Sequence, residues 1–491
     1  MNRRTAAIIG GGVIGGGWAA RFVLSGWNVA VHDPGAHAKQ DVLGALERAR
    51  RSYPAIYDSM LPPEGRLEFI TSIREAVVDA SWIQESVPER LDQKRAVFET
   101  IQKHSAPGAI IASSTSGFRP TDLQNCALRP DEIIVAHPFN PVYLLPLVEV
   151  VQSDVNSPEF VNSAMSVLES IGMSALKVRT EIDAHIGDRL LEAVWREALW
   201  LVRDNIATTG EIDDVIRMGF GLRWAQMGLF ETYRIAGGRQ GMEHFMEQFA
   251  PCLELPWSRL TDVPELDGQL ARKIARQSDE QSGHRTIAEL EEIRDTNLVA
   301  ILRGLKAQNW GAGKFLRKCE VGMVAVKGAS SISCPMRTVE RVVPPDWADF
   351  NGHMNEARYL ELFSFATDVF LEAVGCNQAY IETGGSYFTL ETSIRHLNET
   401  FPGARVFVDT WCLYGEGKKL HIFHSLLNEA GDALATGEHL LIHVDLLQRM
   451  SSEPTPQVAA AIETAAHAHQ GAILPDWAVP KLSFNRTEAS T

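Results

Sequence analysis

The sequence predicts an α/β protein of several domains: a doubly wound N-terminal sheet, an all-α second domain and a C-terminal α+β domain. Three observations predict this order. At 491 residues the chain is too long for one hydrophobic core. Short apolar runs alternate with helical stretches over about the first 180 residues, and helical periodicity dominates from there to about residue 318. Further on, one long helical stretch precedes four runs typical of antiparallel strands.

Changes in sequence pattern divide the chain into five regions. A stretch of small and polar residues that begins at residue 326 is typical of a linker. After about residue 449 strand-forming residues become scarce, so we expect a loosely packed tail. The predicted regions are 1–182 for the doubly wound sheet, 183–325 for the helical domain, 326–336 for the linker, 337–450 for the α+β domain and 451–491 for the tail.

The composition is that of a globular protein, and it limits the kinds of partner that the protein can bind. Hydrophobic residues make up 45% and charged residues 22%, which excludes a mostly disordered protein. The formal net charge of −16 argues against nucleic acid as a partner, because phosphate binding needs a basic field. The chain has no apolar run long enough to predict a membrane span. The six cysteines stand far apart without a CxxC pair, so we predict no metal site, no disulfide framework and a cytoplasmic location.

The first region alternates between buried runs and helical stretches. The run at 5–9 leads through glycines into a helix that ends before Gly26, and the run at 28–32 closes on Asp33. Together they form one βαβ unit of ordinary length. Alternation of this kind favours a parallel sheet covered on both faces. The predicted strands are 5–9, 28–32, 82–85, 109–113, 133–136 and 147–151.

The later regions have different periodicities. Apolar residues recur at helical spacing from 184 to 203, and turns near 219–221, 237–238 and 251–256 separate further helical segments. In the α+β domain we expect a long helix that ends before Gly375, and antiparallel strands joined by glycine-containing turns. The predicted elements there are a strand at 338–343, a helix at 355–374 and strands at 387–397, 406–414, 420–427 and 433–446.

A glycine-rich turn after the first strand satisfies GxGxxG. Gly10 permits the tight turn, Gly12 lets the backbone approach a pyrophosphate, and Gly15 lets helix and strand pack closely. Asp33 ends the next strand, where a carboxylate accepts hydrogen bonds from ribose hydroxyls and repels a 2′-phosphate. The sequence therefore predicts a Rossmann-type domain that binds NAD rather than NADP. The predicted contacts from the turn and strand end are Gly10, Gly12, Val13, Ile14, Gly15 and Asp33.

A histidine and a carboxylate twelve residues apart supply the chemistry of alcohol oxidation. His137 begins the stretch His-Pro-Phe-Asn-Pro, and Glu149 lies further along the chain. A neutral histidine can take the hydroxyl proton as hydride leaves the carbon, and a carboxylate on its far nitrogen stabilises the imidazolium that forms. These residues, the Ser-Ser-Thr-Ser run that ends at Ser116 and the opening glycines resemble the 3-hydroxyacyl-CoA dehydrogenase superfamily over roughly residues 5–320.

The resemblance assigns further roles. It implies that Ser116 hydrogen-bonds the substrate oxygen and that Glu89 and Lys94 lie beside the cofactor and substrate. The superfamily has an asparagine where this chain has Asp188, which lies seven residues before Trp195 and hence on the same helix face.

Within the superfamily, the helix from Asp188 and the segment from Gly221 to Gly238 are most similar to the carnitine dehydrogenases. That resemblance implies L-carnitine as substrate. Aromatic faces and negative charge hold a trimethylammonium group, which cannot donate hydrogen bonds, and either Arg189 or Arg223 meets the carboxylate. The expected substrate contacts are Asn140, Asp188, Trp195, Trp224, Phe230 and Tyr233.

A second motif opens the α+β domain. The run from Pro345 to Asn355, Pro-Asp-Trp-Ala-Asp-Phe-Asn-Gly-His-Met-Asn, resembles the start of hotdog-fold thioesterases of the 4-hydroxybenzoyl-CoA type. The resemblance makes Asp349 the nucleophile or general base, and the N-terminus of the next helix can polarise the thioester carbonyl. Fusion to a carnitine dehydrogenase implies betainyl-CoA as the acyl-CoA substrate.

Other interpretations of the same residues stay open at this point. The dehydrogenase region is also compatible with a fatty-acid-type L-3-hydroxyacyl-CoA dehydrogenase that has an accessory thioesterase, or with an enzyme of L-gulonate type. A third alternative is a crystallin-like protein that binds NAD without catalysis, against which the intact Ser116, His137 and Glu149 argue. Both resemblances imply a homodimer.

Overall fold

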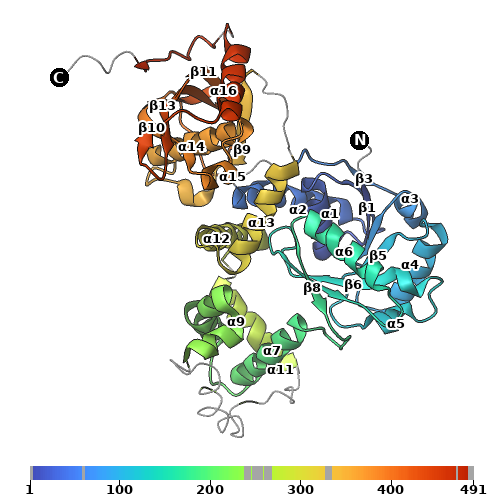
Figure 1. Ribbon diagram of the computed structural model, residues 1–491. Helices are drawn as coiled ribbons and strands as arrows, with labels where there is room; N and C mark the ends of the chain where they lie inside the picture. The colour runs from blue at the N-terminus through green and yellow to red at the C-terminus, as the bar shows by residue number, and fades with distance from the viewer. Residues whose placement is uncertain are drawn as a thin grey trace. The chain divides into compact units, whose positions relative to one another are not determined.

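The computed structural model describes residues 4–57, 61–236, 245, 258, 268–282, 284–326, 334–471 and 474–484. They fall into two compact units (Figure 1). The first comprises residues 1–50 and 63–317, so the predicted sheet and helical domains lie in one unit. The second comprises residues 51–62 and 318–491. The short segment 51–62 thus groups with the C-terminal unit, although it lies within the range that was predicted for the doubly wound sheet.

The first unit contains an eight-stranded sheet of order β3-β2-β1-β4-β5-β6-β7-β8. All six predicted strands are present. The two strands that were not predicted are a three-residue strand, β3, and the edge strand β8, whose middle residues are exposed. The strands are β1 (Thr5–Ile9), β2 (Asn28–His32), β3 (Leu67–Phe69), β4 (Trp82–Glu85), β5 (Ile110–Ser113), β6 (Ile133–Pro138), β7 (Leu147–Val151) and β8 (Ser174–Val178).

The prediction of an all-parallel sheet is wrong at one point. Strand β7 runs antiparallel to β6, whereas the other neighbouring strands are parallel. The connection between them, residues 139–146, is too short for the crossover that a parallel pair requires. The reversal places His137 directly opposite Glu149 in the strand register.

Helices cover both faces of this sheet (Figure 1). On one face, Ile9, Ile83 and Ile111 of the sheet pack against Phe98 of α4 in a fully buried cluster that also includes residues of α3 and α5. On the other face, Phe22 of α1 lies against Trp82. The helices of this region are α1 (Val13–Leu24), α2 (Ala38–Ser52), α3 (Ile73–Val77), α4 (Leu91–His104), α5 (Pro120–Gln124) and α6 (Pro158–Ser170).

The remainder of the first unit is helical, as predicted. Non-helical backbone at Gly219 marks the predicted turn near 219–221, whereas the predicted turns at 237–238 and 251–256 lie outside the described residues. None of the helices in the described ranges combines the length and apolarity needed to cross a bilayer. The elements are α7 (Gly187–Arg203), α8 (Thr209–Val215), the π-helical η3 (Ile216–Phe220), α9 (Gly221–Ala236), α11 (Gly268–Ser282), α12 (Ile287–Ala307) and α13 (Gly311–Val326), of which the part from Lys318 onward belongs to the second unit.

The second unit wraps an antiparallel sheet of order β10-β13-β12-β11-β9 around α14, and all its predicted elements are present. Phe363 of α14 packs in one cluster with Val408 of β11 and Leu426 of β12. The elements are β9 (Met336–Val342), α14 (Glu356–Ala373), α15 (Gln378–Glu382), β10 (Gly385–His396), β11 (Arg405–Glu416), β12 (Lys419–Asn428), β13 (Ala433–Asp445) and β14 (Met450–Ser451), which pairs with β13. Residues 327–333 of the predicted linker lie outside the described residues.

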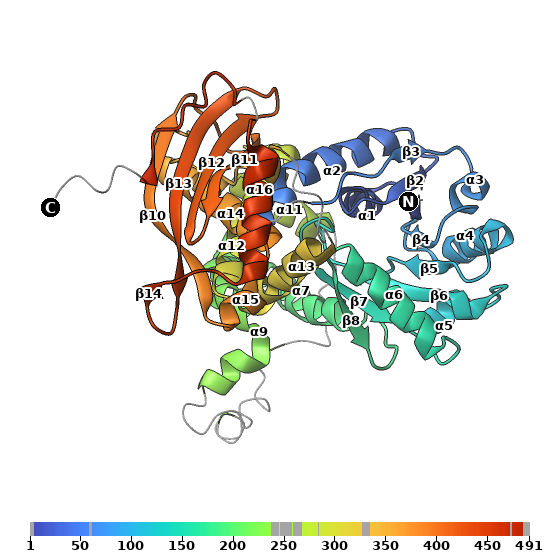
Figure 2. The same ribbon diagram turned by 45° about the horizontal axis from the view of Figure 1, so that its top comes forward.

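The expectation of a loosely packed tail is wrong for α16 (Pro456–His469). Val458, Ile462 and Ala465 of this helix are buried in a cluster with Phe370 of α14, and Figure 2 shows α16 beside β11. The segment is poor in strand formers because it is rich in alanine, which favours helix. Its apolar residues have helical spacing.

Candidate active sites

The glycine turn between β1 and α1 has the geometry that a dinucleotide needs. Gly10 has φ +103°, a conformation that side chains disfavour. A Cβ on Gly15 would lie 1.8 Å from the Gly10 carbonyl oxygen, whereas a Cβ on Gly12 would meet nothing within 4 Å. The backbone is therefore packed tightly behind the turn and open at Gly12. The first turn of α1 has no side-chain cap, so its amides remain able to bind a phosphate.

Asp33 closes this turn from the end of β2. Its carboxylate accepts the backbone N–H of Gly11 at 2.6 Å and that of Gly35 at 2.6 Å. These bonds hold the carboxylate beside the glycine turn, as the ribose contact requires. The turn, the uncapped helix and the placed carboxylate together fit a bound NAD.

His137 and Glu149 form a buried pair. The Nδ1 atom of His137 lies 3.0 Å from Oε2 of Glu149, and the other carboxylate oxygen accepts the backbone N–H groups of Ile186 and Gly187, each at 3.0 Å. Burial by itself raises the pKa of Glu149, but the hydrogen bonds from His137 and the two amides outweigh it and hold that pKa below its ordinary value. An ionised carboxylate only accepts, so Nδ1 carries the proton and Nε2 is free to act as a base.

Asp188 lies on the opposite side of the imidazole. Its Oδ2 is 3.6 Å from Nε2 of His137, because Asp188 stands in the first turn of α7. Gly187 makes this approach possible, since a Cβ there would lie 2.3 Å from the ring of Phe139. The residue expected to bind substrate is thus placed beside Nε2, the ring nitrogen that Glu149 does not contact.

The loop after β5 carries Ser116, which is exposed. Its neighbour Thr115 donates a hydrogen bond to Glu89. Lys94 is 1% exposed and pairs with Glu85 at 2.9 Å and with Glu89 at 3.2 Å. Glu89 and Lys94, which were predicted to lie beside the cofactor and substrate, therefore support this loop. That either residue contacts a ligand stays a prediction.

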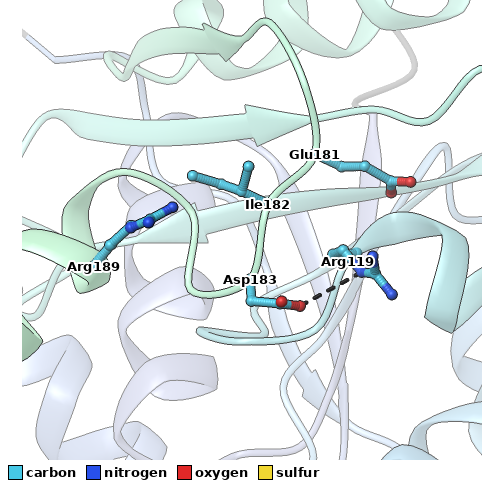
Figure 3. Close-up of a pocket in the computed structure, with 5 residues that line it drawn as sticks. All are labelled: Arg119, Glu181, Ile182, Asp183 and Arg189. Atoms are coloured by element: carbon cyan, nitrogen blue, oxygen red, sulfur yellow. Dashed lines mark ion pairs between the residues drawn. The ribbon is translucent and has the colours of Figure 1, made fainter. Parts of the chain in front are cut away.

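A cavity of about 430 Å³ lies beside the start of α7 (Figure 3). Arg119 and Asp183 both line it, and Nε of Arg119 lies 3.5 Å from Oδ1 of Asp183. A second cavity of about 390 Å³ lies further along α7, and Arg189 lines both. Among the described residues Arg189 has no ion-pair partner, so this guanidinium is available to an anionic group.

The aromatic residues expected around the ammonium group are partly exposed. Trp195 is 55% and Phe230 is 74% exposed, while Trp224 packs against Phe220 and Tyr233 stacks on Phe245. The exposed Asn140 comes directly after Phe139, whose ring lies 5.2 Å from that of His137. These rings are available to a ligand or to another protein surface.

Tyr143, another aromatic near the histidine motif, has a structural role instead. It is buried and donates a 2.6 Å hydrogen bond to Asp295 of α12. Burial, with the hydrogen bond to Asp295, raises the pKa of Tyr143 far above its ordinary value.

The loop before α14 holds the second site. Oδ1 of Asp349 accepts the backbone N–H groups of Asn351 at 2.8 Å and His353 at 3.1 Å. Asn355 caps α14 by accepting the N–H of Ala357. The sequence did not indicate Glu399, whose carboxylate lies 3.3 Å from the His353 ring.

A histidine that can act as base and a dinucleotide turn, both on one doubly wound sheet, are typical of a nicotinamide-dependent alcohol dehydrogenase. Matches to family models agree with this class of enzyme, and they also assign a family to the second unit. Residues 5–182 match the NAD binding domain of 3-hydroxyacyl-CoA dehydrogenase, 185–272 match its C-terminal domain, and 343–462 match the thioesterase-like superfamily.

Full-length relatives define the family. The chain is 57% identical over 478 residues to the L-carnitine dehydrogenase/betainyl-CoA thioesterase of Ruegeria pomeroyi. The aligned residues cover 96% of this chain and 98% of that protein. It is 50% identical to the protein of the same name in Agrobacterium fabrum, with 96% of each chain covered. The chain therefore belongs to the family of L-carnitine dehydrogenase/betainyl-CoA thioesterases. The prediction of an NAD-dependent dehydrogenase fused to a thioesterase is confirmed.

Other relatives match a smaller share of the chain. The L-carnitine dehydrogenase of Mesorhizobium japonicum is 54% identical over 313 residues, which are 63% of this chain and 86% of that protein. Among solved structures, 5-formyl-3-hydroxy-2-methylpyridine 4-carboxylic acid 5-dehydrogenase, an NAD+ dependent dismutase, is 27% identical. It matches with a TM-score of 0.55 over 62% of this chain and 99% of that one.

Proposed function

We propose that the first unit oxidises L-carnitine to 3-dehydrocarnitine and that the second hydrolyses betainyl-CoA to glycine betaine and CoA. The observation that carries the first reaction is the imidazole of His137, whose Nδ1 is held by Glu149 and whose Nε2 remains free to take a proton. Relatives that share half or more of the sequence over 96% of the chain favour this substrate pair over a fatty-acid or gulonate substrate. NADH formation from L-carnitine, compared between the wild type and a His137 variant, tests the assignment.

The proton of the substrate hydroxyl passes to Nε2 of His137. The resulting imidazolium is stabilised by Glu149, which stays ionised because it accepts two amide hydrogen bonds as well. Ser116 orients the substrate oxygen, as the resemblance implies. Gly10, Gly12 and Asp33, with Val13 and Ile14 in the first turn of α1, would hold NAD, which when bound would supply the hydride acceptor.

The two charged ends of L-carnitine require opposite partners. We assign the carboxylate to Arg189, because it follows Asp188 in the first turn of α7, lines both cavities and has no ion-pair partner among the described residues. Asp188 supplies negative charge for the cation, and Trp195 on the same helix supplies an aromatic face.

An Arg189→Met variant is expected to raise KM for L-carnitine roughly 10- to 100-fold, because it loses a hydrogen bond between charged groups. KM for NAD should change less than about twofold, since the dinucleotide turn is untouched. Arg223→Met, the other arginine that the sequence left open, is the matched control, and initial rates of NADH formation measure both variants. If only the Arg223 variant loses affinity, the carboxylate binds there instead.

In the second unit, Asp349 acts on the thioester carbonyl carbon directly or through water. The turn that contains Asp349 leads into α14. Asn355 caps this helix through one amide, so further amides of its first turn remain able to polarise the carbonyl oxygen.

The family-model limits near residues 182, 185 and 343 support the predicted boundaries at 182 and 337.

We also propose that the protein is a homodimer. Large apolar side chains are exposed on both units and are available to an interface with a second chain. They include Leu191 and Leu222 in the helical region, and Phe388 and Leu390 on the edge strand β10. Light scattering at micromolar concentration is expected to give twice the mass of one chain, and a single-chain mass would contradict the proposal.

A further inference from the structure

His185 is a buried histidine that the chemistry described so far does not use. It is 0% exposed, and its ring centre lies 5.5 Å from that of His137. Its Nε2 lies 3.1 Å from the backbone carbonyl oxygen of Thr115. A carbonyl can only accept, so Nε2 carries the proton and donates. Burial lowers the pKa of His185, which keeps the ring neutral beside the reacting histidine.

The backbone around His185 is held in an unusual conformation. Ala184 and His185 both have positive φ, 60° and 50°, although neither is glycine. The surroundings must fix this conformation, since the chain alone disfavours it. Two contacts do so: the His185 ring donates to Thr115, and the Ala184 N–H donates to the carbonyl of Gly117 at 3.1 Å. Both contacts reach the loop that carries Ser116, one on each side of it.

The next residues along the chain hold the catalytic pair. The N–H groups of Ile186 and Gly187 donate to Glu149, and Asp188 faces His137. One short segment, 184–188, therefore contacts the Ser116 loop through its first two residues and the His137–Glu149 pair through its last three. A shift of this segment would move Glu149 and Asp188 relative to the imidazole at the same time.

We propose that His185 is a positioning residue that locks the segment before α7 onto the Ser116 loop and thereby keeps both carboxylates aligned on His137. This inference rests on the proposed role of His137 as the base. The acting atom is Nε2, because Nδ1 is buried and has no hydrogen-bond partner among the described residues. An amide nitrogen at the end of a glutamine side chain reaches about as far as Nε2, whereas that of asparagine reaches only as far as Nδ1.

Three variants of the full chain test the proposal. His185→Phe keeps a ring but removes the donor, His185→Asn places a donor too near the backbone, and His185→Gln restores it at the right reach. We expect kcat for L-carnitine oxidation to fall about 100-fold in the Phe and Asn variants, as for a small misplacement of catalytic groups. The Gln variant should keep kcat within about fivefold of the wild type, since it retains the hydrogen bond to Thr115.

Two controls separate positioning from general damage. The dissociation constant for NAD, measured by fluorescence titration, should change less than about twofold, because the dinucleotide turn is untouched. Betainyl-CoA hydrolysis by the same preparations should match the wild type. If the Phe variant unfolds, the comparison of Gln with Asn still decides, since both are polar side chains. Retention of activity by Asn rather than Gln, or by Phe, would overturn the proposal.

The failure of this inference differs from failure of the proposed function. A His137→Gln variant that stays fully active would show that His137 is not the base. An inactive His137→Gln variant beside a fully active His185→Phe variant would leave the base assignment intact and remove only the positioning role of His185.

Discussion

Replacing His137 with glutamine is expected to lower kcat for L-carnitine oxidation about 10²- to 10⁴-fold, the usual contribution of a general base. Glutamine is similar in size, but its amide cannot take a proton near neutral pH, and its donor reaches as far as Nε2 rather than the Nδ1 that contacts Glu149. The change therefore removes the base together with its hydrogen bond to Glu149 and keeps a side chain of similar volume. NADH formation at saturating L-carnitine and NAD measures the effect.

The same protein preparation contains its own control. Betainyl-CoA hydrolysis takes place in the other compact unit and should be unchanged within experimental error. NAD binding should also persist, because the contacts of the dinucleotide turn come from β1, α1 and β2. A variant that oxidises L-carnitine at the wild-type rate would show that another group takes the proton. Loss of NAD binding together with activity would show instead that the substitution disturbed the fold.

The elements that the sequence predicts well are those encoded locally. Strands such as β1 and β4 are short runs of buried residues, and the glycine turn after β1 identifies the start of α1. The direction of β7 was not predicted because alternation of strands and helices describes the rest of the sheet, whereas this connection contains no helix. Helix α16 was not predicted because a scarcity of strand formers does not separate a loose tail from an alanine-rich helix.

The candidate site shows the same division. His137 and Glu149 were identified because their motif resembles the superfamily's signature, and the strand register explains their spacing by placing them opposite each other. His185 and Glu399 carry no such signal, since each is a single polar residue outside any motif. Their contacts arise only when distant segments meet: the loop after β5 with the start of α7, and the Asp349 loop with the chain after β10. A single sequence contains no pattern from which those contacts can be predicted.

Asp188 lies between these two cases. The sequence identified it as a departure from the superfamily's asparagine, and the structure shows where the extra charge falls: 3.6 Å from the reacting nitrogen of His137. A negative charge at that point favours a cation nearby, as a substrate with a trimethylammonium group requires. The departure is therefore intelligible in terms of the substrate, although its position could only be seen in three dimensions.

Replacing Asp349 with asparagine is expected to lower kcat for betainyl-CoA hydrolysis about 10²- to 10⁴-fold, because an amide is neither a base nor a nucleophile. The turn itself should survive. Oδ1 accepts the N–H groups of Asn351 and His353, and an asparagine side-chain oxygen can accept both in the same way. The other carboxylate oxygen has no hydrogen-bond partner among the described residues and is the atom available for chemistry. Release of the CoA thiol measures the rate.

Asp346→Asn is the matched control, since it makes the same chemical change three residues earlier, in the 3-10 turn Pro345–Trp347. It should leave hydrolysis within about twofold of the wild type, as expected for a substitution away from the reacting atoms. L-carnitine oxidation should be unaffected in both variants. Equal losses in the two would mean that charge near the loop, rather than the Asp349 carboxylate, supports the reaction. Full activity of the Asp349 variant would move the catalytic role to another group, for which Glu399 beside His353 is the first to test.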